Sequence, residues 1–376
     1  MASPEVIVSN VTSVGPTMAE PTGAAQSSDR ESRPRAVGLT NGRNVQLDPD
    51  DPRTPARAEV LDALREQQRP VYLEVDADTS TIIELLIPHI AYVTSITRID
   101  DGVLGVVLDS SHGRHLIRAT ATNAAELERL AQAAVDRGSA VIVTENDRHE
   151  IIDIRDLEHD SHHPPPRYPG PATPPQTSWW QRFVERIRTC WRCHYWPWRW
   201  RCCITMHRAQ EIFDTMAATT CSPLTVPSPC IPFMYPDDGC WARAHEMCRL
   251  MIINGLSPNK VWIQGSLVAA TKNNPNCHVY WGWHVAPTLC VRGKNPWRSQ
   301  RMVIDPSLFT SPVTEAGWKG VQGDLNATLK DTAASDYFWG STDPTYTDTN
   351  SKLAYYRLQL KNRSIQFGPP PYANCP

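Results

Sequence analysis

All eleven cysteines of this 376-residue chain lie between residues 190 and 375, and the first half has none. A chain of this length is too long to form one compact domain by default. The odd cysteine count indicates disulfides together with at least one thiol that is kept free for another purpose. The second half is therefore where cross-links and thiol chemistry are expected.

Composition sets further bounds on the chain. A hydrophobic content of 41% permits a sizeable core, and a net charge of -3 excludes a basic nucleic-acid binder on bulk charge. No apolar run reaches the roughly 18 residues of a membrane-spanning helix. The start of the sequence lacks a basic region and a long apolar region, so no signal peptide is recognised. Cysteine content favours a secreted protein, whereas the missing signal favours the opposite.

Changes in composition predict five segments. Residues up to about 55 are rich in Ser, Thr, Pro, Gly and Arg without periodicity, which predicts disorder. Prolines make the third segment extended and exposed. The predicted segments are a disordered N-terminal segment with a short helix near its end (1–66), a small α+β domain (67–157), a Pro-rich linker (158–178), a Trp/Arg/Cys-rich segment (179–206) and a catalytic domain (207–376).

The small domain is predicted from alternating β-rich runs and one helix. A capping-box pattern over Asn123–Glu126 predicts where the helix begins, and Gly138 predicts where it ends. The predicted strands cover residues 71–75, 82–99, 103–108, 140–144 and 150–154. Paired catalytic groups are missing from this region, so we expect a non-catalytic role.

The Trp/Arg/Cys-rich run over 179–203 has three interpretations. Trp and Arg together suit a membrane surface or another anionic surface. A disulfide-stapled helical hairpin that packs on the catalytic domain is the structural alternative. The third interpretation is a metal site, although adjacent cysteines after Cys-x-x-Cys are not a standard zinc spacing; its ligands would be Cys190, Cys193, His194, Cys202 and Cys203.

A helix is predicted to begin at or just before Cys240, with Asp238 as its N-cap and Gly255 just past its end. The positive end of a helix lowers the pKa of a thiol, and the thiolate is the nucleophile. The free N–H groups there can also hold an oxyanion. A buried structural cysteine or a disulfide partner is the alternative, and the helix alone favours it.

A general base for this thiol is expected from elsewhere in the chain. His245 lies about 140° around the helix from Cys240, so it should point away and be structural. Strands are predicted over 278–291 and 300–304, and a hairpin symmetric about its turn places His284 opposite Asp305, with Cβ atoms roughly 5 Å apart. Such an imidazole–carboxylate pair is what a Cys–His site needs.

The bland alternative for this pair is structural. His284 would be a core histidine between Trp281 and Trp283, and Asp305 would cap a turn before Pro306. Each residue taken singly favours that alternative. Their predicted apposition across the hairpin favours function.

Three sequence blocks resemble the bacterial protein-glutaminase (protein-glutamine deamidase) family in order and spacing, over about residues 207–320. The blocks are Pro229–Met247, Trp281–Ala286 and Val303–Phe309. The resemblance implies a papain- or transglutaminase-like α+β core, in which a helix carrying the nucleophile packs on an antiparallel sheet. It assigns Cys240 as nucleophile, His284 as base and Asp305 as the residue that orients the base. It also implies that Cys221 and Cys230 form one of the disulfides near the nucleophile.

The resemblance implies hydrolysis of the side-chain amide of glutamine in proteins or peptides, with release of ammonia and no metal or organic cofactor. Substrates with exposed glutamine would be the partners, without nucleic acid, and residues 179–203 would supply a surface or membrane contact. Some family members carry an N-terminal pro-region that covers the site, so residues 67–157 are a candidate inhibitory domain of a secreted zymogen. Alternatives are a transglutaminase, a cysteine protease, and a non-catalytic surface-binding toxin module.

Overall fold

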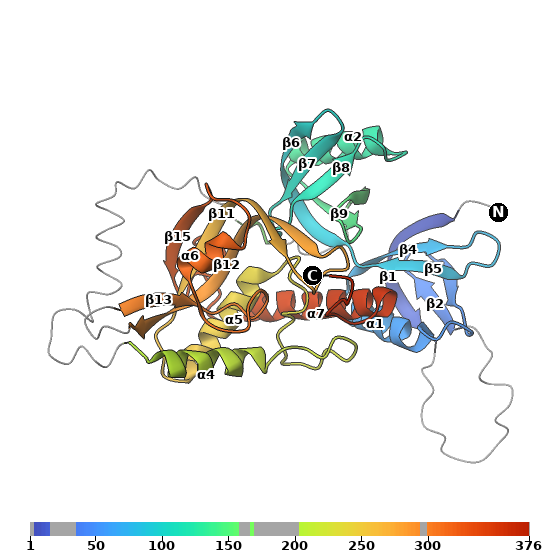
Figure 1. Cartoon of the computed structure of the whole chain (residues 1–376). Coiled ribbons are helices and arrows are strands. Elements are labelled where there is room, and N and C mark those ends of the chain that lie inside the picture. The colour runs from blue at the N-terminus through green and yellow to red at the C-terminus, as the bar shows by residue number, and fades with distance from the viewer. Residues whose placement is uncertain (1–3, 16–34, 158–165, 169–202, 294–298, 376) are drawn as a thin grey trace, which may run out of the picture.

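The computed structural model describes residues 4–15, 35–157, 166–168, 203–293 and 299–375. These residues form a mixed α/β structure with three five-stranded antiparallel sheets. In Figure 1 the first sheet lies at the right, the second at the top and the third at the left, and helix α7 (Thr347–Phe367) runs between them. Within the described residues, no helix combines the length and the apolar character needed to span a bilayer.

The first sheet corrects the prediction of disorder for residues 4–15 and 35–53, whereas the short helix predicted near the end of that segment is confirmed. Its strand order is β3-β2-β1-β4-β5. Its elements are β1 (Glu5–Val14), β2 (Arg35–Leu39), β3 (Asn44–Leu47), α1 (Thr54–Glu66), β4 (Pro70–Val75) and β5 (Ile82–Leu86). Ile7, within the run Val6–Val8, and Val11, which stands between polar residues, are both buried in the core. Because β1 pairs with β4 throughout its first half, the domain boundary predicted at residue 67 is also wrong.

The second sheet agrees with most of the strands and the helix predicted for the small domain. Its order is β10-β9-β6-β7-β8. Its elements are β6 (His89–Asp100), β7 (Val103–Leu108), β8 (His115–Arg118), α2 (Ala124–Arg137), β9 (Ala140–Glu145) and β10 (Ile151–Asp156). Gly138 ends α2 in the left-handed region with φ 59°. The capping box does not form, because Asn123 donates its side-chain amide to the Ile152 carbonyl instead.

The third sheet carries the predicted catalytic region, in the order β14-β13-β12-β11-β15. Its elements are α4 (Met206–Ala217), α5 (Cys240–Ile253), β11 (Asn259–Ala270), β12 (His278–Arg292), β13 (Ser299–Val303), β14 (Val313–Thr314), α6 (Glu315–Gly320), β15 (Thr328–Ala333) and α7. Helix α5 packs against β12, the central strand. The predicted helix from Cys240 and the long strand to residue 291 are therefore confirmed.

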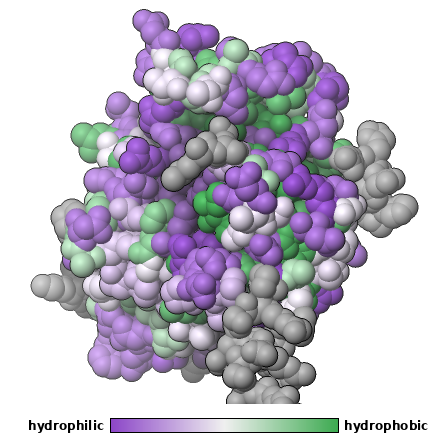
Figure 2. All heavy atoms as spheres, turned by 90° about the vertical axis from the view of Figure 1, so that its right-hand side faces the viewer, coloured by the Kyte–Doolittle hydropathy of each residue, from purple (hydrophilic) through white to green (hydrophobic). Residues whose placement is uncertain are grey.

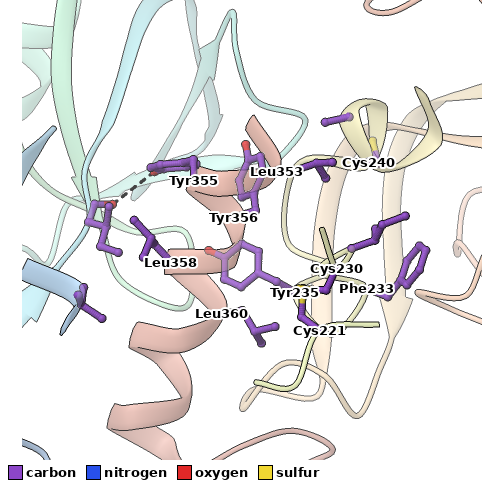
Figure 3. Packing of buried hydrophobic residues seen from close by; sticks show 14 of the residues in the cluster. Cys221, Cys230, Phe233, Tyr235, Cys240, Leu353, Tyr355, Tyr356, Leu358 and Leu360 are labelled. Carbon is purple, nitrogen blue, oxygen red and sulfur yellow. Dashed lines mark hydrogen bonds between the residues drawn. A yellow bond between two sulfur atoms is a disulfide. The ribbon is translucent and has the colours of Figure 1, made fainter. Parts of the chain in front are cut away.

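One hydrophobic cluster runs without interruption from the first sheet to the third sheet and the helices that pack on it. It contains the apolar side chains of β1 and α1, the inner face of α7, and Trp241 of α5. Figure 3 shows Tyr355, Leu358 and Leu360 of α7 in this cluster, with Cys240 nearby. Hydrophilic residues cover most of the face shown in Figure 2, and hydrophobic residues are scattered among them. Most of the apolar side chains in this cluster therefore pack the first sheet and α1 against α5 and α7.

The linker and the Trp/Arg/Cys-rich segment fall largely outside the described residues. Of the linker, the structure places residues 166–168, and the Tyr168 ring lies 4.8 Å from that of Phe338. Residues 179–202, for which surface, hairpin and metal interpretations were given, lie outside the described residues. The same is true of the candidate metal ligands Cys190, Cys193, His194 and Cys202. Cys203 forms a disulfide with Cys290, which removes it from the proposed set of metal ligands.

Three disulfides join described cysteines, and the predicted Cys221–Cys230 pair is confirmed. The pairs are Cys203–Cys290, Cys221–Cys230 and Cys277–Cys375. Cys240 and Cys248 are the free cysteines among the residues described. Three disulfides are compatible with secretion, because such bonds persist in oxidising compartments.

The pairing can be checked on the native protein. After alkylation without reduction and digestion, mass spectrometry should find these three linked peptide pairs, with alkyl groups on Cys240 and Cys248 once the chain is denatured. Finding Cys240 in a disulfide of the active protein would contradict its role as a nucleophile. A fully reduced active protein would contradict the disulfides alone.

Candidate active site

Cys240 is the first residue of α5, at the position predicted from the sequence. The N-cap is Gly239 rather than Asp238, which corrects the prediction. Gly239 has φ 81°, and a Cβ there would clash with the Tyr356 ring, so only glycine fits this turn. Asp238 instead accepts a hydrogen bond from the Gly239 N–H at 2.8 Å. The turn delivers the thiol to the positive end of the helix.

His284 and Asp305 lie in direct contact. The Nε2 atom of His284 lies 2.9 Å from Oδ2 of Asp305, and the indole N–H of Trp318 donates to the same oxygen at 2.9 Å. All three side chains are buried. The carboxylate therefore fixes the His284 ring, and Trp318, which sequence reasoning missed, fixes the carboxylate. A lone tryptophan on a short helix carries no local signal of this role.

The strand register differs from the predicted one. Thr288 pairs with Val303, so the hairpin is shifted by two residues, and β13 ends before Asp305. Because side chains alternate between the two faces of a strand, a shift of two residues keeps His284 and Asp305 on the same face. The predicted contact forms, although the two residues are not directly opposed.

The thiol and the imidazole also come together. Ring nitrogens of His284 and His112 and the Cys240 Sγ all lie within 4.8 Å of one another. With Nε2 on Asp305, the other ring nitrogen of His284 is buried and has no hydrogen-bond partner among the described residues. The ring stacks on Trp281 with centroids 4.4 Å apart. The structure thus gathers Cys240, His284 and Asp305 in one buried place.

His112 was not predicted, and it comes from the second sheet. It lies in the covering loop, residues 109–114, between β7 and β8. Its Nδ1 lies 3.4 Å from the Cys240 Sγ and 2.8 Å from the Trp283 carbonyl oxygen. The loop backbone runs along β12, because the Gly282 N–H donates to the His112 carbonyl at 2.9 Å and the Arg114 N–H donates to the Tyr280 carbonyl at 3.0 Å. A single histidine in a turn gives no sequence signal for this contact.

The thiol of Cys240 lies in buried surroundings that disfavour its charged form. Burial raises the pKa of Cys240 well above its ordinary value, and Asp238 adds to this, while Arg243 opposes it. The expected lowering by the helix end is therefore outweighed in the covered chain. Burial also lowers the pKa of His112 to about 3, so that ring is neutral. The thiol is protonated and shielded in this form of the protein.

Asp305 stays ionised in the same surroundings. Burial acts to raise the pKa of Asp305, but His284 and hydrogen bonds from His284 and Trp318 hold it below its ordinary value. A carboxylate is therefore kept next to the ring that it orients.

His245 faces away from the site, as predicted. Its Nδ1 lies 2.9 Å from the Thr349 hydroxyl, and its ring stacks on Tyr346 with centroids 4.6 Å apart. Burial lowers the pKa of His245 to about 4. This histidine joins α5 to the start of α7.

The comparisons with known proteins agree with the predicted resemblance. Residues 209–322 match the model of the glutaminase family. The chain carries a glutaminase-family enzyme. Its similarity to this family had been predicted over about residues 207–320, which is confirmed. Among curated proteins, none matches the chain.

Solved structures of two forms are similar to this glutaminase. A crystal structure of a pro-protein-glutaminase is 22% identical, covers 77% of this chain and 99% of its own, and gives a TM-score of 0.48. A crystal structure of a protein-glutaminase is 30% identical over 42% of this chain and 90% of its own, with a TM-score of 0.38. The NMR structure of protein-glutaminase from Chryseobacterium proteolyticum is 27% identical over 46% and 97%, with a TM-score of 0.38.

Proposed function

We propose that the chain is the latent form of a secreted protein glutaminase, which hydrolyses the side-chain amide of glutamine in proteins or peptides and releases ammonia. The observation that carries the proposal is the arrangement of Cys240 at a helix start, beside a histidine whose second nitrogen binds Asp305. Exposed glutamines of protein substrates are the proposed partners. The core is proposed to be papain- or transglutaminase-like, with α5 on the antiparallel sheet.

The chemistry follows from these three residues. The Cys240 thiol gives its proton to the free nitrogen of His284, and the sulfur attacks the glutamine Cδ. N–H groups at the start of α5 hold the oxyanion. His284 returns the proton to the departing ammonia, which leaves a thioester. His284 then takes a proton from water, and the hydroxide attacks the thioester carbon. The C–S bond breaks, glutamate is released, and His284 returns the proton to the sulfur, which restores the thiol. Asp305 keeps the proton of His284 on Nε2, so that the other nitrogen stays available.

Latency is supported by the covering loop. An extended peptide that runs along β12 beside His284, with a side chain against the thiol, occupies the place where a substrate glutamine must lie. The whole loop belongs to the N-terminal part, and the Pro-rich linker that follows is the kind of segment that proteases cut. The full chain should therefore be inactive until the N-terminal part is removed.

The function is tested by measuring ammonia. Chain cut in the linker and freed of its N-terminal part should release ammonia from a glutamine-containing peptide with blocked ends. Mass spectrometry should show a gain in peptide mass consistent with conversion of that glutamine to glutamate. Incorporation of an added primary amine would indicate a transglutaminase, and backbone cleavage would indicate a protease; either result in place of deamidation would refute the proposal.

The role of Asp305 gives a quantitative prediction. Asp305→Asn keeps the size of the side chain but favours the wrong tautomer of His284, so turnover in the cut enzyme should fall on the order of 10²-fold or more. His245→Ala is the matched control, because it removes a buried histidine of α5 that faces away from the site. It should lower the melting temperature and leave turnover nearly unchanged. Loss of turnover in His245→Ala but not in Asp305→Asn would show that the base is wrongly chosen.

A further inference from the structure

Three histidines surround one carboxylate at the end of the second sheet that faces the glutaminase core. His89 begins β6, His115 begins β8, Glu145 ends β9, and His149 lies just before β10. A ring nitrogen of each histidine contacts the Glu145 carboxylate, at 3.2 Å for His89, 2.5 Å for His115 and 2.9 Å for His149. All three histidines are buried. Nothing in the proposed reaction uses these residues.

The second nitrogens of two of these rings are also placed. The Nε2 of His115 lies 2.8 Å from the Ser111 hydroxyl. The Nε2 of His149 faces a carboxylate oxygen of Asp237 at 3.7 Å, too far for a hydrogen bond. A histidine that ligates a metal characteristically turns its other N–H toward a carboxylate or another acceptor, which fixes the ring and its tautomer. His115 shows this pattern, and the Nδ1 atoms of both rings contact Glu145 directly.

We propose that His89, His115, Glu145 and His149 bind one zinc ion. Imidazole nitrogen and carboxylate oxygen are ligands that zinc prefers, and His89 would complete a set of four around the three ligands that the structure gathers. Ligand atoms of His115, Glu145 and His149 already lie within 4.8 Å of one another, and His89 reaches the same carboxylate. The site would tie together three strands and the turn before β10.

A proton is the alternative occupant of the cluster. Burial acts to lower the pKa of His149, but Glu145 and Asp237 raise it to about 9, so a protonated His149 can balance the buried carboxylate. An experiment must therefore separate zinc from a proton network. It must also separate this site from the neighbouring group of Cys240, His112 and His284, which has metal-ligand chemistry of its own.

The site would act on the covering loop, and this part of the inference rests on the proposed latency. Ser111 lies in that loop, where its hydroxyl contacts His115 and accepts the Gly113 N–H at 3.0 Å. Asp237, beside His149, precedes the turn that carries Cys240. A metal bound here would hold Ser111 through His115 and would thereby favour the covered form.

Metal content of the tag-free full chain tests the proposal, without any activity assay. Chain purified after growth with zinc should contain about one zinc ion by elemental mass spectrometry. Glu145→Gln and His115→Gln should lose that zinc, whereas Cys240→Ser should keep it. No bound zinc when zinc is supplied would overturn the proposal in favour of the proton network. Loss of zinc in Cys240→Ser, with retention in Glu145→Gln, would move the metal to the thiol.

Cobalt substitution gives a readout that needs no variant, which matters if a variant fails to fold. Cobalt(II) bound by imidazole and carboxylate should give weak visible bands without a thiolate-to-cobalt charge-transfer band. That band would place the metal on cysteine and refute the assignment. Added zinc should also raise the melting temperature of the metal-free full chain, because a ligand that binds the folded state stabilises it. A normal zinc content in the full chain, with no ammonia release after the N-terminal part has been removed, would support the site while refuting the glutaminase.

Discussion

Replacing Cys240 with alanine is expected to reduce ammonia release, by enzyme cut in the linker and freed of its N-terminal part, by on the order of 10⁴-fold or more, because the thioester cannot form. The fold should survive, since alanine fits the first turn of a helix. Cys248→Ala is the matched control: it removes the other free, buried thiol of α5. Burial raises the pKa of Cys248 to about 11, and turnover without it should be nearly unchanged. The measurement is initial ammonia release at saturating glutamine peptide.

His284→Ala should reduce turnover as much as loss of the thiol does, because the effects of substitutions at residues that act as one catalytic unit are not additive. The double variant Cys240→Ala/His284→Ala should therefore be no worse than either single variant. Substantial turnover in Cys240→Ala, with a normal melting curve, would exclude the proposed nucleophile. A large loss of turnover in Cys248→Ala, with turnover retained in Cys240→Ala, would show that the wrong thiol of α5 was assigned as the nucleophile.

The second large effect is expected from removing the N-terminal part. Turnover should rise by about 10²-fold or more after the linker over 158–178 is cut and the N-terminal fragment is separated, because tethering can strengthen an intramolecular contact by that factor. In the full chain Cys240 is only 1% exposed, so substrate has no access to the thiol. Adding a fragment of residues 4–157 should suppress turnover again. A fragment of residues 69–157 lacks the β1 partner of β4 and should suppress poorly.

A point variant separates the effect of the covering loop on Cys240 from the effect of covalent attachment of the N-terminal part. His112→Gly removes the ring from the thiol and should raise the turnover of uncut chain, while the exposed substitution Glu128→Ala on α2 should not. Equal turnover before and after removal of the N-terminal part would exclude latency and leave the three catalytic assignments untouched.

The candidate site could be predicted because its signals are local. A helix start fixes Cys240, and one hairpin holds both His284 and Asp305, so even a register error of two residues preserved the contact. His112 had no such signal, since it meets Cys240 across two different sheets. The first sheet was missed for a related reason. Strand β1 is stabilised by pairing with β4, more than fifty residues later, and its apolar residues are the short run Val6–Val8 followed by isolated valines, which gives no clear alternation.

The continuous hydrophobic cluster through α7 sets how the enzyme would switch on. On α7, Tyr355 contacts the Pro88 carbonyl at 3.2 Å and Asn362 contacts the Leu85 carbonyl at 2.9 Å, in addition to the apolar packing with α1. None of these contacts is broken by a cut in the linker. The two pieces would stay bound as a complex, whose dissociation is governed by mass action. Enzyme that has been cut but still binds its N-terminal piece would thus remain inactive at high concentration. It would gain activity on dilution, as the two pieces dissociate.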